Sequence, residues 1–279
     1  LALIKDEQRT ESAEKGDESA EKRPMRSGKE EKKVAIVVYN MQGDTVRNYT
    51  ENVEVGMNRV YWGMNHNGVR FPSRNPRRGN DDPPGGYEVL PGTYKVVASL
   101  GDVKDSTMVT VKADPRLDVP MSDRRAKVAA YKKIYAMVET AANAADRIRD
   151  MENTIKTVNE ALANADKDAK KEIMDMGKAL QDSLSAMEDY MFGKENIKGI
   201  KRSDETLRNY LFGMYRYIGA SDGAPNQAGQ RAMQFAEEKL SAMLEHLNNF
   251  TMEDFAAYQE KVEAMEFSLF PEMKPIRME

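Results

Sequence analysis

The residues of this 279-residue chain form no coherent set of nucleophile, base and orienting group, although acidic side chains are plentiful. The sequence has no cysteine and two histidines, which excludes thiol nucleophiles, disulfides and Cys-based metal sites and leaves little for a His-rich metal centre. His66 lies between two asparagines without a nearby carboxylate and nucleophile, and His246 lies near the expected end of a helix, where a cation suits the helix dipole. The sequence therefore predicts no catalytic residue, no metal and no cofactor, and we interpret the chain as a non-enzyme.

Three consecutive oxygen donors at Asn80, Asp81 and Asp82 are the best candidate for a cation site. Consecutive residues seldom surround a hard cation such as Ca²⁺ without further ligands and a shaped loop. We interpret them as a solvated turn.

A basic and aromatic cluster is the strongest candidate for a binding surface. Its members are Arg70, Phe71, Arg74, Arg77 and Arg78. They lie in residues 65–86, a stretch so rich in Gly, Pro and Asn that it predicts a long loop, and such loops often carry binding residues. Guanidinium groups suit a phosphate, a sugar acid or an acidic face of a partner. The alternative is a loop that folds back on its own module, with its arginines paired to nearby Asp and Glu.

Composition narrows the classes of partner. The formal net charge is −4, which argues against a nucleic-acid binder that relies on a dense basic surface. No apolar run approaches the roughly 20 residues that span a bilayer, and no signal segment precedes the rest of the chain. Because the chain begins at Leu1, we expect a mature product or a piece of something longer.

Residues 1–33 mix acidic and basic side chains evenly and contain almost nothing apolar after Ile4. Such a stretch cannot bury enough surface to offset the entropy of ordering it. The pattern predicts a charged linker or arm, and an interaction tail is the functional alternative.

From Val34 the sequence changes to short β-branched runs separated by Gly, Pro and Asn. The predicted strands are 34–39, 45–49, 59–62, 94–100 and 107–112. Short strands with turn signals at this spacing predict an Ig-like antiparallel β-sandwich over residues 34–113.

Beyond residue 114 the apolar residues recur every three or four positions, which is typical of amphipathic helices. We expect helices at about 122–164, 173–191, 203–219, 226–249 and 251–265. Ser203 is the expected N-cap of the third, and Thr251 with Asp254 forms a capping-box-like start for the fifth. Single apolar stripes and short connections predict an antiparallel bundle of about five helices over 114–279. Most of the 19 methionines are expected to fill its core.

Four motifs in the predicted sandwich resemble a known family. They are Tyr-Asn-Met-Gln-Gly-Asp-Thr-Val-Arg (39–47), Gly-Met-Asn-Arg-Val-Tyr-Trp (56–62), Leu-Pro-Gly-Thr-Tyr-Lys-Val (90–96) and Lys-Ala-Asp-Pro-Arg (112–116). In this order they are similar to the Ig-like, flagellar-hook-capping-like module near the C-terminus of bacterial, Bacteroidetes-type, sortilin-like BNR β-propeller proteins. The match covers residues 34 to about 160. One departure is that Gly63 follows Trp62, where the family has an acidic residue and then Leu-Arg.

The matched motifs assign structural rather than functional roles. The residues concerned are Gly43, Trp62, Pro91, Gly92, Tyr94, Asp114, Pro115 and Arg116. Gly43 permits a tight turn, Pro91 and Gly92 form the turn before the last hairpin, and Tyr94 is expected to pack on Trp62.

The resemblance implies a non-catalytic docking or assembly region of a cell-envelope or secreted protein. Its expected partner is a β-propeller, either upstream in a precursor or in another envelope chain. The alternative is a carbohydrate- or peptide-binding module attached to a secreted hydrolase, with the arginine cluster contacting the glycan or peptide.

Overall fold

The computed structural model describes residues 32–75, 82–162, 167–195 and 205–265. The chain divides into two compact units. The sheet unit comprises residues up to Gly68 and the range Asn80–Asp118, and the helical unit comprises Val69–Gly79 and Val119–Glu279. A short piece of the loop predicted at 65–86 therefore belongs to the helices. The charged arm predicted at 1–33 lies almost entirely outside the described residues.

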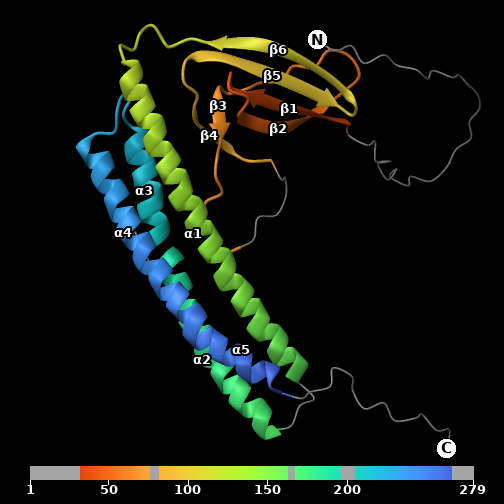
Figure 1. Cartoon of the computed structure of the whole chain (residues 1–279), viewed down its shortest axis with the longest axis vertical. Helices are drawn as coiled ribbons and strands as arrows, with labels where there is room; N and C mark the ends of the chain where they lie inside the picture. Colours follow the sequence, from red (N-terminus) through yellow and green to blue (C-terminus); the bar gives the residue numbers. More distant parts are fainter. Residues whose placement is uncertain (1–31, 76–81, 163–166, 196–204, 266–279) are drawn as a thin grey trace, which may run out of the picture. The chain divides into compact units, whose positions relative to one another are not determined.

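The sheet unit is an antiparallel sheet region (Figure 1). Its strands are β1 (Lys32–Tyr39), β2 (Thr45–Val53), β3 (Asn65–Asn67), β4 (Gly85–Glu88), β5 (Gly92–Leu100) and β6 (Val103–Val111). Four of them form one sheet in the order β2-β1-β5-β6, and β3 pairs with β4 in a second sheet. β2 and β6 are therefore the edges of the larger sheet.

Four of the five predicted strands are confirmed, as β1, β2, β5 and β6. The strand predicted at 59–62 is wrong, because the structure has no ladder there. Side chains hold this stretch instead: the Tyr49 hydroxyl donates to the Tyr61 carbonyl at 3.0 Å, and Trp62 Nε1 donates to the Asn65 carbonyl at 3.0 Å.

A small apolar core stabilises the sheet unit. Val38, Val46, Val89 and Tyr94 are its buried members. The expected contact between Trp62 and Tyr94 is confirmed, with ring centroids 5.3 Å apart in an edge-to-face arrangement, a geometry that favours aromatic pairs.

The other motif residues lie in turns. Gly43 has a φ of +90° in the turn between β1 and β2, a conformation that favours glycine. Pro91 directly precedes Gly92, the first residue of β5. In the Asp-Pro-Arg motif, Asp114 accepts hydrogen bonds from the backbone and guanidinium of Arg116, and these close a local turn after β6.

The helical unit is built from five α-helices (Figure 1). They are α1 (Met121–Ala161), α2 (Lys167–Phe192), α3 (Leu207–Gly219), α4 (Gln227–Phe250) and α5 (Ala256–Glu263). Packed pairs include α1 with α2, α3 and α4, α3 with α4, and α2 with α5. Their contact faces are the predicted apolar stripes, with fully buried Ile134, Ile148, Leu184, Leu211, Met214 and Met187. Among the described residues, no helix has both the length and the apolar character that crossing a membrane requires.

Two expected helix starts differ from the structure. The predicted N-cap Ser203 lies outside the described residues, and the cap observed for α3 is Thr206, whose side chain accepts from the amide of Asn209. The capping box at Thr251 is wrong: Thr251 has helical dihedrals, and its hydroxyl donates to the Leu247 carbonyl at 2.6 Å. α4 therefore continues through a π-helical segment, Thr251–Phe255, into α5.

Candidate functional site

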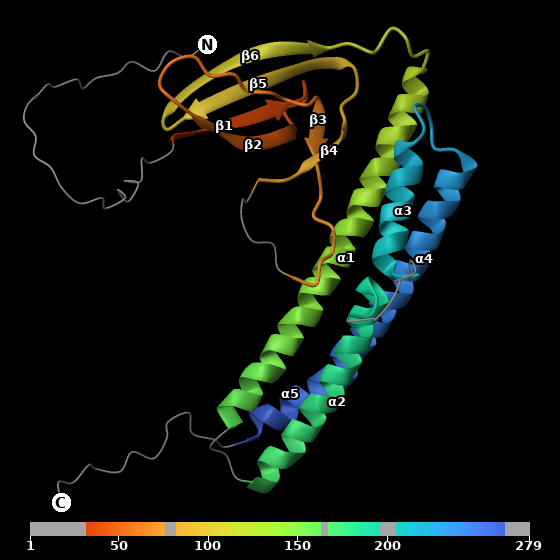
Figure 2. The same ribbon diagram turned by 180° about the vertical axis from the view of Figure 1, so that it is seen from behind.

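The described residues of the 65–86 loop that belong to the helical unit lie against α1 (Figure 2). We call its described residues, 69–75, the inserted segment. The chain enters the helical unit after Gly68, leaves it after Gly79 and returns after Asp118. The inserted segment carries Arg70, Phe71 and Arg74, three of the five residues predicted to bind a partner.

Two arginines share one carboxylate at the centre of α1. Arg70 donates two hydrogen bonds to Asp146, one of them 3.1 Å long. Arg149, one turn further along α1, donates to Asp146 at 2.8 Å. Its other guanidinium nitrogens donate to the carbonyls of Ser73 at 2.9 Å and Arg74 at 3.2 Å. Asp146 thus binds Arg70 of the inserted segment directly. It also orients Arg149 of α1, which binds the backbone carbonyls of the segment.

Arg74 lies in an acidic cage at the C-terminal end of α2. Its guanidinium contacts Glu188 at 3.0 Å and Asp189 at 3.2 Å, and it donates to the carbonyl of Gly193. The Phe192 ring centroid is 5.6 Å from its central carbon. A cation here pairs with carboxylates and also satisfies a carbonyl at the helix end.

Phe71 supplies the apolar contact of the inserted segment. Its ring stacks on Phe212 of α3 with centroids 4.3 Å apart and meets Tyr215 edge to face at 6.1 Å. The guanidinium of Arg208 lies over the same Phe212 ring, 5.2 Å from its centroid. The segment is therefore attached to α1, α2 and α3 by both ionic and aromatic contacts.

The carboxylates around the segment differ in their pKa. The hydrogen bond from Arg70, aided by Arg149, lowers the pKa of Asp146 despite its partial burial. Burial raises the pKa of Glu188, with further contributions from Glu195 and Asp189, and together these exceed the opposing effect of Arg74 and Arg149. Burial and the neighbouring Glu188 likewise raise the pKa of Glu152 on α1. Burial is therefore the main cause of the raised pKa of Glu188 and Glu152, whereas the arginine hydrogen bonds dominate at Asp146.

These contacts bear on the predicted binding surface. Arg70 and Arg74 are paired with carboxylates, as the alternative interpretation expected, but those carboxylates belong to α1 and α2 rather than to the sheet module. Arg77 and Arg78 lie outside the described residues. Binding of a partner by this cluster stays a prediction, and its described guanidiniums are engaged within the chain.

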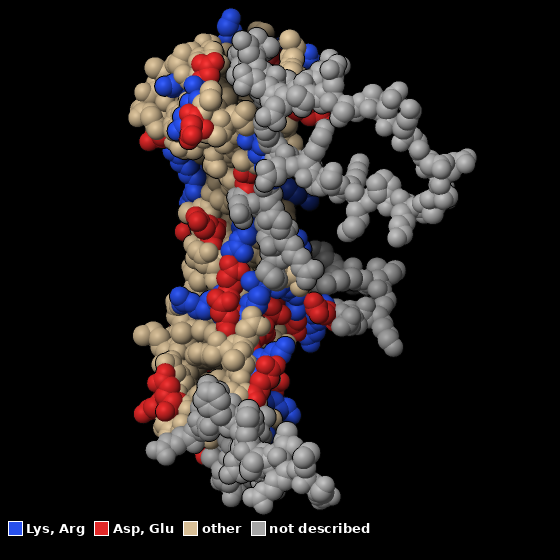
Figure 3. Space-filling view, turned by 90° about the vertical axis from the view of Figure 1, so that its right-hand side faces the viewer, with Lys and Arg blue, Asp and Glu red and all other residues tan. Residues whose placement is uncertain are grey.

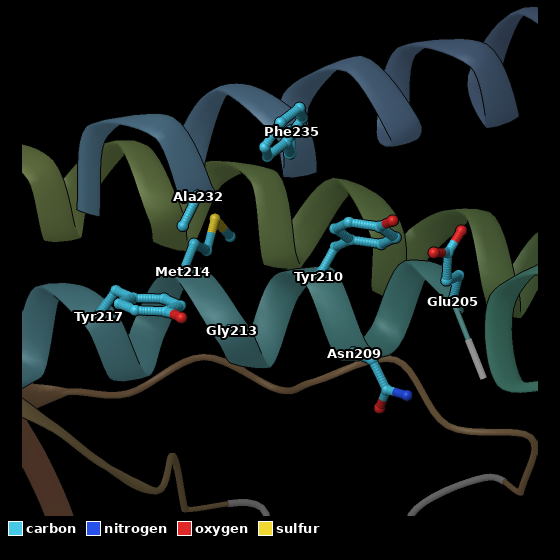
Figure 4. Close-up of a pocket in the computed structure, with 8 residues that line it drawn as sticks. All are labelled: Glu205, Asn209, Tyr210, Gly213, Met214, Tyr217, Ala232 and Phe235. Carbon is cyan, nitrogen blue, oxygen red and sulfur yellow. The ribbon is translucent and has the colours of Figure 1, made fainter. Parts of the chain in front are cut away.

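A groove between α3 and α4 is the candidate site that the sequence did not reveal (Figure 4). Its volume is about 270 Å³, and its lining residues are Glu205, Asn209, Tyr210, Gly213, Met214, Tyr217, Ala232 and Phe235. Tyr217 is 54% exposed and Phe235 is 41% exposed. A Cβ atom built on Gly213 would meet nothing within 4 Å, so the helix surface is open at that point.

Two cations lie beside the aromatic lining. Arg231 is 5.3 Å from the Phe235 ring centroid, and Lys239 is 5.6 Å from that of Tyr210. Figure 3 shows a different face of the molecule, on which acidic and basic side chains are interspersed. The groove therefore combines an apolar floor with a charged rim, which suits a protein partner better than a small ion.

The remaining candidates have local roles. His66 stacks on Tyr87 with centroids 4.5 Å apart, and His246 is exposed on α4. Asp82 accepts hydrogen bonds from the backbone and hydroxyl of Thr50, while Asn80 and Asp81 fall outside the described residues. In the described ranges, no three His, Asp or Glu side chains are grouped so as to hold a metal.

Comparison of the chain with protein-family models, with curated proteins and with solved structures found no match. The likeness of its motifs to sortilin-like proteins is therefore a hypothesis.

Proposed function

We propose that the chain is a non-catalytic docking or assembly region, and that the groove between α3 and α4 binds the partner protein. The exposed aromatic lining of this groove is the observation that carries the proposal. Tyr, Phe and Met are enriched at the centres of protein interfaces, where they give up water to a complementary surface. Their exposure beside the buried Met214 supports docking.

The opening above Gly213 suggests how a partner would bind. An apolar side chain of the partner enters between Tyr217 and Phe235 and packs on Met214, which is fully buried beneath. Arg231 and Lys239 then face acidic groups around that side chain. Aromatic contacts supply most of the affinity, and the charged rim sets the orientation.

The partner and compartment follow from the motifs rather than from the groove. We propose a β-propeller of a sortilin-like protein, in the same precursor or in another chain, at the cell envelope or secreted. The same proposal places the sheet unit in the Ig-like sandwich class and the helical unit among antiparallel bundles. The second sheet, β3 with β4, and the packing of Trp62 into the shared core support the first assignment.

The alternative is a carbohydrate- or peptide-binding module of a hydrolase. It needs the charge of the arginine cluster, and Arg70 and Arg74 already satisfy Asp146, Glu188 and Asp189. Docking through the groove is therefore the stronger proposal.

The test is affinity capture from envelope extract with the full chain, followed by cross-linking and mass spectrometry. Phe235→Glu should abolish capture of the specific partner, because a carboxylate would be buried against apolar surface. Gly213→Leu should also abolish it by filling the opening, and leucine favours the helix more than glycine does. Met252→Glu is the matched control, since Met252 is 77% exposed and outside the groove. Identical capture by wild type and both groove variants would overturn the proposal.

A further inference from the structure

The two edges of the four-stranded sheet are protected differently. Along β2, the outward amide of Asn48 donates to Asn67 Oδ1 at 3.0 Å, and that of Thr50 donates to Asp82 Oδ2 at 2.9 Å. Arg47 adds hydrogen bonds to the carbonyls of Pro83 and Pro84. Side chains therefore occupy two outward amides of this edge, and Arg47 holds residues 83 and 84 beside it, which hinders the addition of another strand.

β6 has no comparable cover among the described residues. Its first six residues are exposed, including the apolar Val103 and Met108, which are 67% and 52% exposed. Within the described part of the chain, one side-chain bond reaches its backbone, and it is local, from the amide of Ser106 to Asp105 Oδ1 at 2.7 Å. The second half, Thr107 to Val111, is uncharged and β-branched apart from Met108, a composition that favours strand pairing.

The register of the sheet shows which groups of β6 point outward. The amides of Asn48 and Thr50 face away from β1, and hydrogen-bonding direction alternates along antiparallel strands. When this alternation is followed through the residue pairings from β2 to β1, β5 and β6, the backbone N–H and C=O groups of the odd-numbered residues of β6 face β5. The outward residues are then Lys104, Ser106, Met108 and Thr110, which agrees with the local bond of the Ser106 amide.

We propose that β6 pairs antiparallel with β6 of a second copy of this chain, about a two-fold axis at Thr107. In this register, the backbone of Lys104 exchanges hydrogen bonds with that of Thr110 in the other copy, and the backbone of Ser106 does so with that of Met108. Thr107 lies opposite Thr107 of the other copy in a pair without hydrogen bonds. The two sheets become one continuous sheet. A closed, self-complementary pairing of this kind is the commonest symmetry of homo-oligomers.

Charge is compatible with a second copy of β6 and excludes two neighbouring registers, and the length of the strand favours the register at Thr107. With the axis at Thr107, Lys104 faces Thr110 and Asp105 faces Val109, so no like charges are opposed. An axis at Asp105 would oppose two carboxylates, and an axis at Met108 would place Lys104 opposite Lys112, which costs stability. The Thr107 register also pairs the full length of Val103–Val111. The strand is thus complementary to itself.

The absence of cysteine from the sequence allows a test of this register. The two copies of the residue on the axis lie within disulfide distance of each other. The two copies of a residue away from the axis are separated by several residues along the paired strands. Under mild oxidation of the full chain, Thr107→Cys should cross-link roughly tenfold faster than Asp105→Cys. Glu51→Cys, on the capped edge, is the control for random collision. Equal rates at positions 105 and 107 would overturn the proposal.

Mass in solution supplies an independent test. Wild type should show twice the chain mass by light scattering at tens of micromolar. Met108→Pro should be a monomer, because proline removes an outward amide while leaving the β5 side of the strand intact. Circular dichroism checks that this variant stays folded, and Met108→Lys is a second variant if it does not. Phe235→Glu should still dimerise, which separates this proposal from the groove. A wild-type monomer throughout would overturn self-pairing.

Discussion

The two parts of the 65–86 loop are attached by different chemistry. Near β2, the anchors are Asn67, Asp82 and Arg47, which bond mainly to backbone groups within the sheet unit. In the inserted segment, the anchors are ion pairs of Arg70 and Arg74 with helix carboxylates. The comparison teaches that one loop serves two units, through side-chain bonds to backbone groups in the sheet unit and through ion pairs between side chains in the helical unit. The two attachments should therefore respond differently to mutation and to pH.

The largest effect is expected when the acidic cage loses its cation. Arg74→Met should lower the free energy of unfolding of the helical unit by about 2 kcal/mol, because Glu188, Asp189 and the Gly193 carbonyl lose a shared partner in a half-buried place. Urea unfolding followed by helical circular dichroism measures it. Arg116→Met is the control, since its ion pair is exposed and local and solvent screening leaves it little effect on stability. Equal losses in both variants would contradict the cage.

A smaller effect is expected in the part of the loop that is attached to the sheet unit. Asn67→Ala removes the acceptor for the Asn48 amide and a donor to Asn48 Oδ1, which should lower the stability of the sheet unit by about 1–2 kcal/mol. The single tryptophan, Trp62, reports on that unit alone through its fluorescence. The helical transition should not move, and Glu51→Ala should change neither. A shift of the helical transition would mean that the two attachments are not separate.

The smallest effect concerns pH. Because the pKa of Glu152 is raised in the folded state by burial and by Glu188, its ionisation opposes folding above that pKa, and the penalty fades as pH falls toward its ordinary value of 4.5. Asp146 behaves oppositely: its pKa is lowered, so its stabilisation is present above 3.8 and is lost as pH falls through the folded value.

Glu152→Gln should therefore stabilise the helical unit at pH 7 by less than about 1 kcal/mol. The difference from wild type should shrink as the pH falls toward 4.5. Urea unfolding at several pH values, followed by helical circular dichroism, measures it. A gain that grows on acidification would contradict the assigned cause.

Local periodicity made much of the fold predictable. β-branched runs identified β1, β2, β5 and β6, and the helical period located the helices, because burial of one face imposes these patterns. β3 and β4 are too short to leave a pattern. The chain at 59–62 has the composition of a strand, but the bonds of Tyr49 and Trp62 hold it outside any ladder.

The sites were harder to predict because their partners are distant in sequence. Arg70 meets Asp146 across 76 positions, and Arg74 meets Glu188 across 114. No spacing rule links such residues. The groove was hidden because Phe235 belongs to an apolar stripe that predicts burial. Gly213, a glycine inside a helix, was the one signal that could have indicated an open surface there.

The passage of the chain into the helical unit and back has a consequence for fragment design. A cut after Asp118 would yield a helical fragment without residues 69–75, so Asp146 would lose Arg70, Glu188 would lose Arg74, and Phe212 would lose its stacking partner. The complementary fragment would keep a loop with no surface to receive it. Helices expressed alone would therefore need residues 69–75 supplied as a separate peptide, and binding of that peptide would reconstitute a split protein.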